Sequence, residues 1–553
     1  MPRFTSLLIT TSLWVACQRP SVDPAKDPSP STDDTDVAPS PGPPAVRITP
    51  HLAVAGSPVR CVVTPPGPEV TWWRGDLPVT SGVVGDTIAD AGPAGSTLSC
   101  EAGGVRDTVA VSNGQFGTNI LLVILDDTGV DKISDWRIGA FPPPTPRISR
   151  LADEGVRFAR AWANAVCSPT RAGILTGLHP MNNGIGHALT SNGLGLQEDF
   201  TTLPELLRSS SPHRYATAAF GKWHITGRGA GLDSPRAHGF DHFAGSIANL
   251  GEEGDYWNWL RIEDGVEAPS TVYATEDIVR SASTWIQAAP EPWFAWVGLH
   301  VAHTPFHAPP SGWTVRPVDE NSPVANRIDG MIESADVAIG EILSAMSPEA
   351  AARTHVIVIA DNGTAWPGVR PPLDPERAKA SPYEGGIHVP LVMRGPLISR
   401  GDHLVPQPVN HVDLFPTIAE IAGVELTPEQ LGRLDGRSLL PYLISADAPT
   451  HRRTVYSETF QGRAVDARTN WRRAVRWNDW KLIRWPSGKE ELFDLAPTGL
   501  DERDLLLAQP LTAEAQAAYD ELRQALDVEY VPRWDIGASP GEDTGLDSSA
   551  ALP

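Results

Sequence analysis

Acidic and amide side chains follow directly after two apolar runs of the sequence. Asp126–Asp127 come after the run Asn119–Leu125, and Asp361–Asn362 come after His355–Ala360. If these runs are neighbouring parallel strands, three carboxylates and one amide oxygen converge at one sheet edge, where their repulsion requires a cation. All are hard oxygen ligands, which favours calcium or magnesium over zinc. Taken alone, each pair is more typical of a turn or a helix cap.

A cysteine lies in a segment that suits an anionic reaction centre. The segment reads Cys167–Ser168–Pro169–Thr170–Arg171. Proline is favoured in the first turn of a helix, so we expect Cys167 at the positive end of a helix with Arg171 one turn further on the same face. The alternative interpretation is a buried structural cysteine, which needs neither the proline nor the arginine.

This segment matches the Cys-x-Pro-x-Arg signature of the sulfatase family, which belongs to the alkaline phosphatase superfamily. The resemblance extends from Thr118 to about Leu507, and its arylsulfatase branch is the most similar. Further matching motifs are Asp126–Asp127, Gly221–Lys222–Trp223–His224, Ala302–His303–Thr304–Pro305, Asp361–Asn362–Gly363 and Lys379–Gly386. One departure is His388, where many relatives have arginine, and we expect it to alter loop packing or substrate contact.

The resemblance implies a metal centre and a modified residue. A sulfatase-maturing enzyme, such as a formylglycine-generating enzyme, would oxidise Cys167 to formylglycine. The metal would be Ca2+, with Mg2+ as the alternative. Its implied ligands are Asp126, Asp127, Asp361, Asn362 and the modified Cys167.

The resemblance also implies how a sulfate ester would be hydrolysed. Lys222 and Lys379 would neutralise the sulfate oxygens, and Arg171 would hold the formylglycine in its hydrated form. One hydroxyl of the hydrate would attack sulfur while His303 protonates the departing alcohol. The second hydroxyl would then lose its proton to His224, and sulfate would leave as the aldehyde re-forms.

The apolar runs predict the elements that must position these residues. Continuous apolar segments are typical of parallel strands that are buried on both faces, and helical patterns lie between them. We therefore expect an α/β fold whose central, mostly parallel sheet is sandwiched by helices, as in alkaline phosphatase. The expected strands include Asn119–Leu125, Thr217–Phe220, Trp293–Val297 and His355–Ala360. Three short runs between Arg473 and Leu495 predict a small antiparallel sheet, which a helix over about 513–526 would cover.

The N-terminal region predicts export and an additional module. Residues 1–17 have a basic start and a short apolar run that ends in Ala16–Cys17, which resembles a lipoprotein signal with Cys17 as the lipid anchor. The alternative is an ordinary cleaved signal. The order Cys61, Trp72 or Trp73, Cys100 resembles an immunoglobulin-like sandwich with an inter-sheet disulfide. The alternative there is a spacer with a stapled loop.

A chain of 553 residues exceeds what one core usually serves, so we expect subdivision. The net charge of −23 makes nucleic acid an unfavourable partner. The predicted divisions are an export signal at 1–17, a disordered linker at 18–45, an immunoglobulin-like domain at 46–113, a catalytic domain at 118–450, a C-terminal subdomain at 451–536 and a disordered tail at 537–553. The expected location is the periplasm or the cell surface.

Two other functions compete with sulfate ester hydrolysis. A phosphatase or phosphodiesterase on the same fold would use similar metal and lysine contacts, but a typical one would carry serine or threonine in place of Cys167. A non-catalytic lipoprotein that binds sulfated glycans would not need the complete set of proposed catalytic residues.

Overall fold

The computed structural model describes residues 45–49, 53–54, 58–64, 69–74, 77–84, 87–90, 97–102, 105–112, 116–190, 195–398, 401–445, 448–450, 452–462, 469–508 and 510–533. The predicted export signal with Cys17, nearly all of the predicted linker and the predicted tail lie outside these residues. Among the described residues, no helix is both long enough and apolar enough to cross a membrane.

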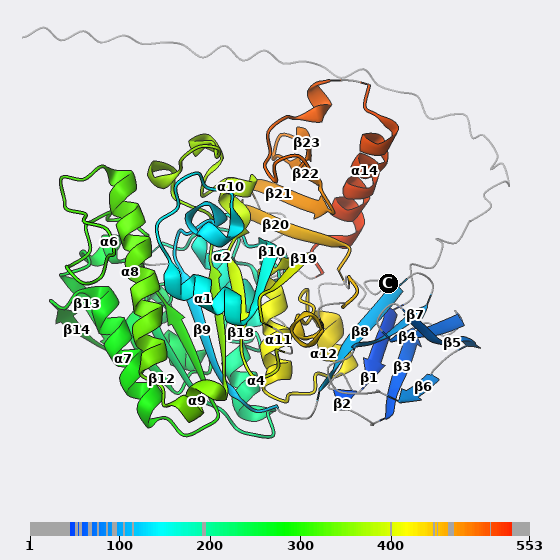
Figure 1. Ribbon diagram of the computed structural model, residues 1–553, viewed down its shortest axis with the longest axis horizontal. Coiled ribbons are helices and arrows are strands. Elements are labelled where there is room, and N and C mark those ends of the chain that lie inside the picture. The colour runs from blue at the N-terminus through cyan, green and yellow to red at the C-terminus, as the bar shows by residue number, and fades with distance from the viewer. Residues whose placement is uncertain are drawn as a thin grey trace, which may run out of the picture. The chain divides into compact units, whose positions relative to one another are not determined.

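A large mixed sheet forms the core of the molecule (Figure 1). Its strand order is β14-β13-β12-β11-β15-β9-β16-β18-β10-β17, and β19 pairs with β10. The strands are β9 (Asn119–Leu125), β10 (Val156–Trp162), β11 (Ala216–Lys222), β12 (His242–Ser246), β13 (Trp259–Glu263), β14 (Val266–Ser270), β15 (Trp293–Gly298), β16 (Thr354–Ala360), β17 (His388–Val389), β18 (Leu391–Arg394) and β19 (His403–Asn410).

The central strands follow the expected pattern, but the sheet as a whole does not. The run β12-β11-β15-β9-β16 is parallel, and every residue of β9, β15 and β16 is buried. The flanks are largely antiparallel, so the prediction of a mostly parallel sheet is wrong for the flanks. At one flank, β13 and β14 are joined by the two-residue turn Asp264–Gly265, in which both residues have positive φ angles. Such a turn makes an antiparallel hairpin.

Helices pack in two groups around this sheet. In one group, α1 and α7 both contact α8, and α7 also packs on β11 and β15. In the other group, α2, α4 and α11 contact one another, and α4 packs on β11 as well. The expected α/β fold is therefore confirmed. The helices are α1 (Pro146–Glu154), α2 (Cys167–Thr176), α4 (Leu203–Ser209), α7 (Ala274–Ala288), α8 (Val324–Ser344) and α11 (Leu414–Ile421).

The predicted C-terminal sheet is present and fully antiparallel. Its order is β20-β21-β22-β23, and α14 (Ala513–Gln524) packs on β21 and β22 before a π-helical turn at Ala525–Glu529. The strands are β20 (Thr454–Gln461), β21 (Thr469–Trp477), β22 (Trp480–Arg484) and β23 (Glu490–Asp494). Alternate residues fill two cores: Leu482 packs with Leu522 of α14, whereas Ile483 packs with Trp162 of β10.

The N-terminal strands form two smaller sheets, ordered β1-β3-β6 and β2-β8-β7-β4-β5. The strands are β1 (Ala45–Thr49), β2 (Ala53–Val54), β3 (Pro58–Thr64), β4 (Glu69–Arg74), β5 (Leu77–Val84), β6 (Thr87–Asp90), β7 (Thr97–Ala102) and β8 (Val105–Ser112). The expected disulfide joins Cys61 of β3 to Cys100 of β7, and the buried Trp72 lies opposite Cys100 in the strand register. The immunoglobulin-like assignment itself stays a prediction.

Candidate functional site

The carboxyl ends of β9 and β16 bring the predicted acidic residues together. The strand register pairs Leu125 with Ala360, so Asp126 and Asp361 follow at the same level. The backbone N–H of Asp127 donates to Asp361 Oδ1 at 3.3 Å, and Asn362 Nδ2 donates to Asp127 Oδ1 at 2.9 Å. All four side chains are buried.

The donor set at this edge fits a hard cation. Carboxylate oxygens of Asp126, Asp127 and Asp361 and the sulfur of Cys167 lie within 4.8 Å of one another. Asp126 Oδ1 and Asn362 Oδ1 are buried and have no hydrogen-bond donor. Burial and the neighbouring Asp126 raise the pKa of Asp361 to about 6. Because buried acceptors without donors are costly, an oxygen-seeking cation is the natural partner for these atoms.

Cys167 is the first residue of α2, as expected for a group at the positive end of a helix. Its sulfur lies 3.4 Å from Lys222 Nζ and 3.9 Å from Lys379 Nζ. Burial raises the pKa of the thiol to about 12, although both lysines act in the opposite direction. The unmodified residue is therefore a protonated thiol at neutral pH and a poor nucleophile.

Three positively charged side chains contact the acidic edge, which is the group Asp126, Asp127 and Asp361 at the carboxyl ends of β9 and β16. Lys222 Nζ lies 2.5 Å from Asp126 Oδ2, and Lys379 Nζ lies 2.5 Å from Asp127 Oδ1. Arg171 Nε donates to Asp361 Oδ2 at 2.8 Å. Burial raises the pKa of Asp126 when taken alone, but Lys222, His303, Arg171 and Lys379 together hold that pKa well below its ordinary value. The site therefore carries buried positive charge that could receive an anion.

Close packing between β11 and β15 lets Arg171 reach this position. Arg171 Nη1 donates to the carbonyl oxygen of Lys222 at 2.8 Å. A Cβ atom on Gly298 would lie 2.4 Å from that carbonyl oxygen and 2.8 Å from Arg171 Nη1. Glycine is therefore required where the last residue of β15 meets the guanidinium.

The two histidines predicted to move protons have different surroundings. His224 Nε2 lies 2.9 Å from the carbonyl oxygen of Leu189, and a carbonyl only accepts, so Nε2 carries the hydrogen. Its Nδ1 is buried without a partner and is left with a lone pair. His303 is only half-buried. One of its ring nitrogens, a carboxylate oxygen of Asp127 and the sulfur of Cys167 lie within 4.8 Å of one another, close enough to share a metal ion. Burial, Lys222 and Lys379 lower the pKa of His303 to about 4.

The sequence interpretation missed a pair beside these groups. Ser246 Oγ lies 2.7 Å from His300 Nε2, and Ser246 Oγ also donates to the carbonyl oxygen of Ala248. Tyr256 OH donates to the carbonyl oxygens of His300 and His303, which braces the segment that carries His303. The positions of these two residues could have indicated the pair. Ser246 is the last residue of the parallel strand β12, and His300 comes shortly after β15.

His388, the departure from the family pattern, contacts Glu384 and β10. Its Nδ1 lies 3.2 Å from Glu384 Oε2, and its Nε2 lies 2.9 Å from the carbonyl oxygen of Ala159. His388 is buried, so it contributes to loop packing, which was one of the two expected effects.

The structure thus brings every predicted site residue into one buried cluster or its immediate rim. The residues predicted to bind the metal and the sulfate come from the ends of β9, β11 and β16, from the first turn of α2 and from the loop after β16. Two of the predicted site residues, Asp127 and His224, have positive φ angles of 50° and 54°. Such backbone strain is typical of functional sites.

Comparison with known proteins gives a consistent result. The family model described as Sulfatase matches residues 118–424, and the one described as N-sulphoglucosamine sulphohydrolase, C-terminal, matches residues 378–527. The chain is 26% identical to mouse steryl-sulfatase over 521 residues, which cover 74% of this chain and 81% of that protein. It is 28% identical to human N-acetylgalactosamine-6-sulfatase, with 59% of this chain and 66% of that protein covered. The latter alignment spans slightly less than two thirds of the human protein.

Solved structures share the fold at low identity. Ps i-CgsB, solved in complex with k-i-k-neocarrahexaose, has a TM-score of 0.63 and 23% identity, covering 76% of this chain and 94% of that one. BT4656, solved with its substrate D-glucosamine-2-N, 6-O-disulfate, has a TM-score of 0.56 and 20% identity, covering 74% of this chain and 97% of that one.

Proposed function

This chain belongs to the sulfatase family of sulfuric ester hydrolases, and from that premise we propose that it cleaves an aryl or carbohydrate sulfate ester with a formylglycine made from Cys167 and a bound Ca2+. The observation that carries this proposal is the surroundings of Cys167. Its sulfur lies within reach of two lysines and three aspartates, at the start of a helix. Such a site suits a tetrahedral anion better than it suits a thiolate.

The proposed metal site uses the oxygens that lack donors. Asp126, Asp127, Asp361 and Asn362 would hold Ca2+, with Mg2+ as the alternative, together with the modified residue 167. When bound, the cation would withdraw charge from the sulfate oxygens and release Lys222 and Lys379 from their carboxylate partners.

The side chains of this chain have separate roles in the proposed reaction. Formylglycine would supply a hydrated aldehyde as the nucleophile. Lys222 and Lys379 bind the sulfate oxygens where charge accumulates, and Arg171 orients residue 167 from the next turn of the helix. A bound sulfate anion would raise the pKa of His303 from its low resting value, and His303 would then protonate the oxygen of the departing alcohol. His224 takes up a proton at Nδ1, the nitrogen left free by its contact with Leu189.

Mass spectrometry of the tryptic peptide Ala161–Arg171 tests the modification. The peptide should be taken from protein made beside a maturation enzyme, and it contains no cysteine other than Cys167. We expect the mass of an aldehyde in place of the thiol. An intact thiol, in a host that matures a reference sulfatase, would contradict the proposal.

Turnover assays test the reaction class. The matured protein should release sulfate from an aryl sulfate much faster than it releases phosphate from the matched phosphate monoester or diester. Faster phosphoester turnover would instead favour the phosphatase or phosphodiesterase alternative. Binding of sulfated glycans without hydrolysis, by protein with proven formylglycine, would favour the binding protein.

Metal analysis tests the cation. Protein dialysed against Ca2+ should retain about one ion per chain, and the variant Asp361→Asn should retain less. We expect chelation to abolish turnover and Ca2+ to restore it. A metal content unchanged in Asp361→Asn would place the ion elsewhere.

We also propose that the protein is exported to the periplasm or cell surface, with Cys17 as a lipid anchor. The Cys61–Cys100 pair supports an oxidising compartment. Processing in the native host should be sensitive to globomycin, an inhibitor of lipoprotein signal cleavage. Insensitive processing would favour an ordinary signal.

A further inference from the structure

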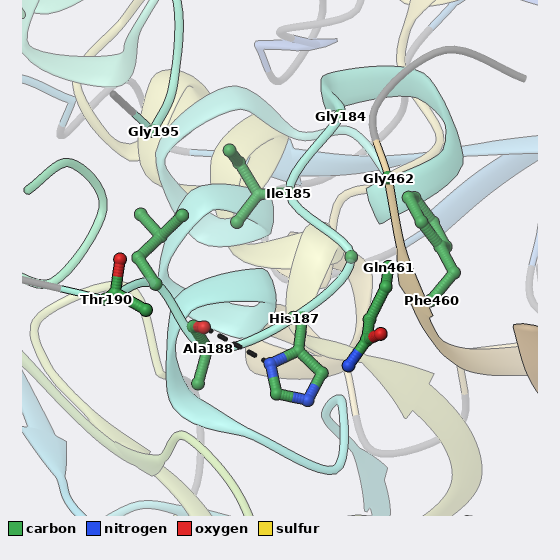
Figure 2. Close-up of a pocket in the computed structure, with 11 residues that line it drawn as sticks. Gly184, Ile185, His187, Ala188, Thr190, Gly195, Phe460, Gln461 and Gly462 are labelled. Atoms are coloured by element: carbon green, nitrogen blue, oxygen red, sulfur yellow. Dashed lines mark hydrogen bonds between the residues drawn. The ribbon is translucent and has the colours of Figure 1, made fainter. Parts of the chain in front are cut away.

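A pocket opens beside the catalytic cluster, between the loop after the short helix α3 (Pro180–Asn183) and the end of β20 (Figure 2). Its volume is about 440 Å³, which is in the range of small-molecule sites. One wall is the segment Gly184–Thr190, and the other is Phe460–Gly462. The two walls are joined by the hydrogen bond from the backbone N–H of Phe460 to the carbonyl oxygen of Gly186.

The first wall is attached directly to the reacting centre. The backbone N–H of Leu189 donates to Ser168 Oγ at 3.0 Å, and Ser168 is the neighbour of Cys167. The carbonyl oxygen of Leu189 accepts from His224 Nε2 at 2.9 Å. One pocket residue therefore contacts both the helix turn of the nucleophile and the proposed base, so a group held in the pocket lies next to the reaction.

The described lining residues are apolar or polar without a formal charge. Ile185, Leu189 and Phe460 supply the apolar surface, and the described lining residues include no lysine, arginine, aspartate or glutamate. Polar atoms come mainly from His187, Thr190 and Gln461, and in Figure 2 the imidazole and the Gln461 amide project to the same side of the pocket. His187 Nδ1 donates to the carbonyl oxygen of Ala188, which leaves Nε2 as an acceptor for a hydroxyl.

We infer that this pocket receives the alcohol half of the ester, and that this half is an uncharged ring with hydroxyl or amide groups. The inference rests on the proposed function. An additional carboxylate or sulfate on the alcohol would enter without a cation among the described lining residues, in a chain whose net charge is −23. The substrate class is therefore a singly charged sulfate ester and not a polyanionic chain.

The test uses two aryl sulfates of nearly equal shape, 4-carboxamidophenyl sulfate and 4-carboxyphenyl sulfate. The parent protein should have the higher kcat/KM on the carboxamide. In the variant Gln461→Lys, we expect the ratio of the two kcat/KM values to fall about fivefold, the size of a partly exposed charge pair. Comparing the ratio between variant and parent cancels the different reactivity of the two phenols.

A matched control places the same change of charge outside the pocket. Gln516 is an exposed residue of α14, and Gln516→Lys should leave the ratio unchanged. An unchanged ratio in Gln461→Lys, or a parent preference for the carboxylate, overturns the inference while sulfate release still supports the proposed function. Release of sulfate from neither ester, by protein with proven formylglycine, overturns both.

Discussion

Lys222 and Lys379 approach the sulfur of Cys167 from different parts of the chain, one from the end of β11 and one from the loop after β16. Each also contacts an aspartate of the acidic edge. Charge at this site is thus balanced pair by pair, and removal of one member leaves its partner buried without compensation. A single substitution should therefore lower turnover without lowering stability only where the replaced residue is uncharged in the resting protein.

Cys167→Ala meets that condition, since the buried thiol is neutral. We expect kcat for an aryl sulfate to fall by a factor on the order of 10⁴, because the nucleophile is lost. Unfolding free energy should change by about 1 kcal/mol, as for loss of one small buried group. Steady-state kinetics and urea unfolding measure the two effects, and substantial residual turnover would argue against this residue as the nucleophile.

His355 predicts a dependence of stability on pH. Burial, with a further effect of Arg394, lowers its pKa to about 3 from an ordinary value of 6.5. Its Nε2 accepts from the backbone N–H of Leu397. A proton on Nε2 would place two N–H groups against each other. The unfolded chain then binds the proton more tightly. The stabilisation is full above pH 6.5 and declines as the pH falls towards 3, by up to about 1.4 kcal/mol per pH unit.

Urea midpoints at pH 7 and pH 5 measure this effect. The variant His355→Gln keeps a donor and an acceptor but does not titrate in this range, so its stability should decline less on acidification than that of the parent. Equal declines in both proteins would show that other groups carry the acid sensitivity.

At the scale of elements, the active site depends on how closely β11 and β15 approach. Their parallel register ends at Gly221 opposite Gly298, next to the guanidinium of Arg171. Any side chain at this point must displace either the carbonyl of Lys222 or the arginine. The pair of strands therefore supports α2 at Arg171.

Gly298→Ala should displace Arg171 while the fold persists. We expect kcat to fall by roughly 10²-fold, the cost of a misplacement of about 1 Å. Gly432→Ala is the control, since its Cβ meets nothing within 4 Å and it should leave kcat unchanged. Circular dichroism checks the fold of both variants, and normal kcat in a folded Gly298→Ala would remove Arg171 from its proposed role.

The C-terminal sheet is joined to the loop of Lys379 by a buried charge cluster. Lys481 Nζ of β22 lies 3.0 Å from Glu384 Oε1 and 2.9 Å from Asp501 Oδ1. Burial would raise the pKa of Glu384, but Lys481, His388 and Arg476 hold it below its ordinary value. Glu384 begins the helical turn α10 (Glu384–Ile387), whose Gly386 carbonyl accepts from the backbone N–H of Gly363 beside Asn362.

Lys481→Met leaves two buried carboxylates without their ammonium partner. We expect the unfolding free energy to fall by about 3–5 kcal/mol. Lys489→Met removes an exposed lysine from the neighbouring strand connection, and no measurable change is expected. Urea unfolding of the two variants gives the comparison. Equal stability of both would mean that the cluster is not a structural link between the sheet and the loop.

At the scale of the whole molecule, the N-terminal strands carry their own core and their own covalent link. The proposed catalytic residues all lie between Asp126 and Lys379, outside that module. A change that lowers the stability of the N-terminal module should therefore leave the activity of the catalytic region unchanged.

Cys100→Ser tests this separation. Opening a loop with a sequence separation of 39 residues should lower the stability of the module by about 4 kcal/mol in the chain-entropy estimate. We expect kcat/KM on an aryl sulfate to stay within about twofold of the parent. Limited proteolysis reports the module, and a parallel loss of activity would show that the catalytic region depends on it.

Much of the architecture was predictable because its signals are local. Continuous apolar runs indicated the buried parallel strands, and alternation indicated the C-terminal sheet and the N-terminal strands. The antiparallel flanks were not predicted, because strand direction at the flanks depends on connections between distant segments. The turn Asp264–Gly265 was a local signal for one flank, but nothing local specified the pairing of β16 with β18.

The sequence by itself determined which residue types are available for the chemistry: the cysteine signature, the acidic pairs after the strands and the expected lysines and histidines. Only the tertiary structure decided the distances among them, the burial that makes Cys167 a neutral thiol, and the Ser246–His300 pair. The pocket beside Leu189 also depends on tertiary contacts, since its walls are far apart in the chain. The physical reason is that residue type and local periodicity are properties of short segments, whereas electrostatics and cavities depend on every segment that packs around them.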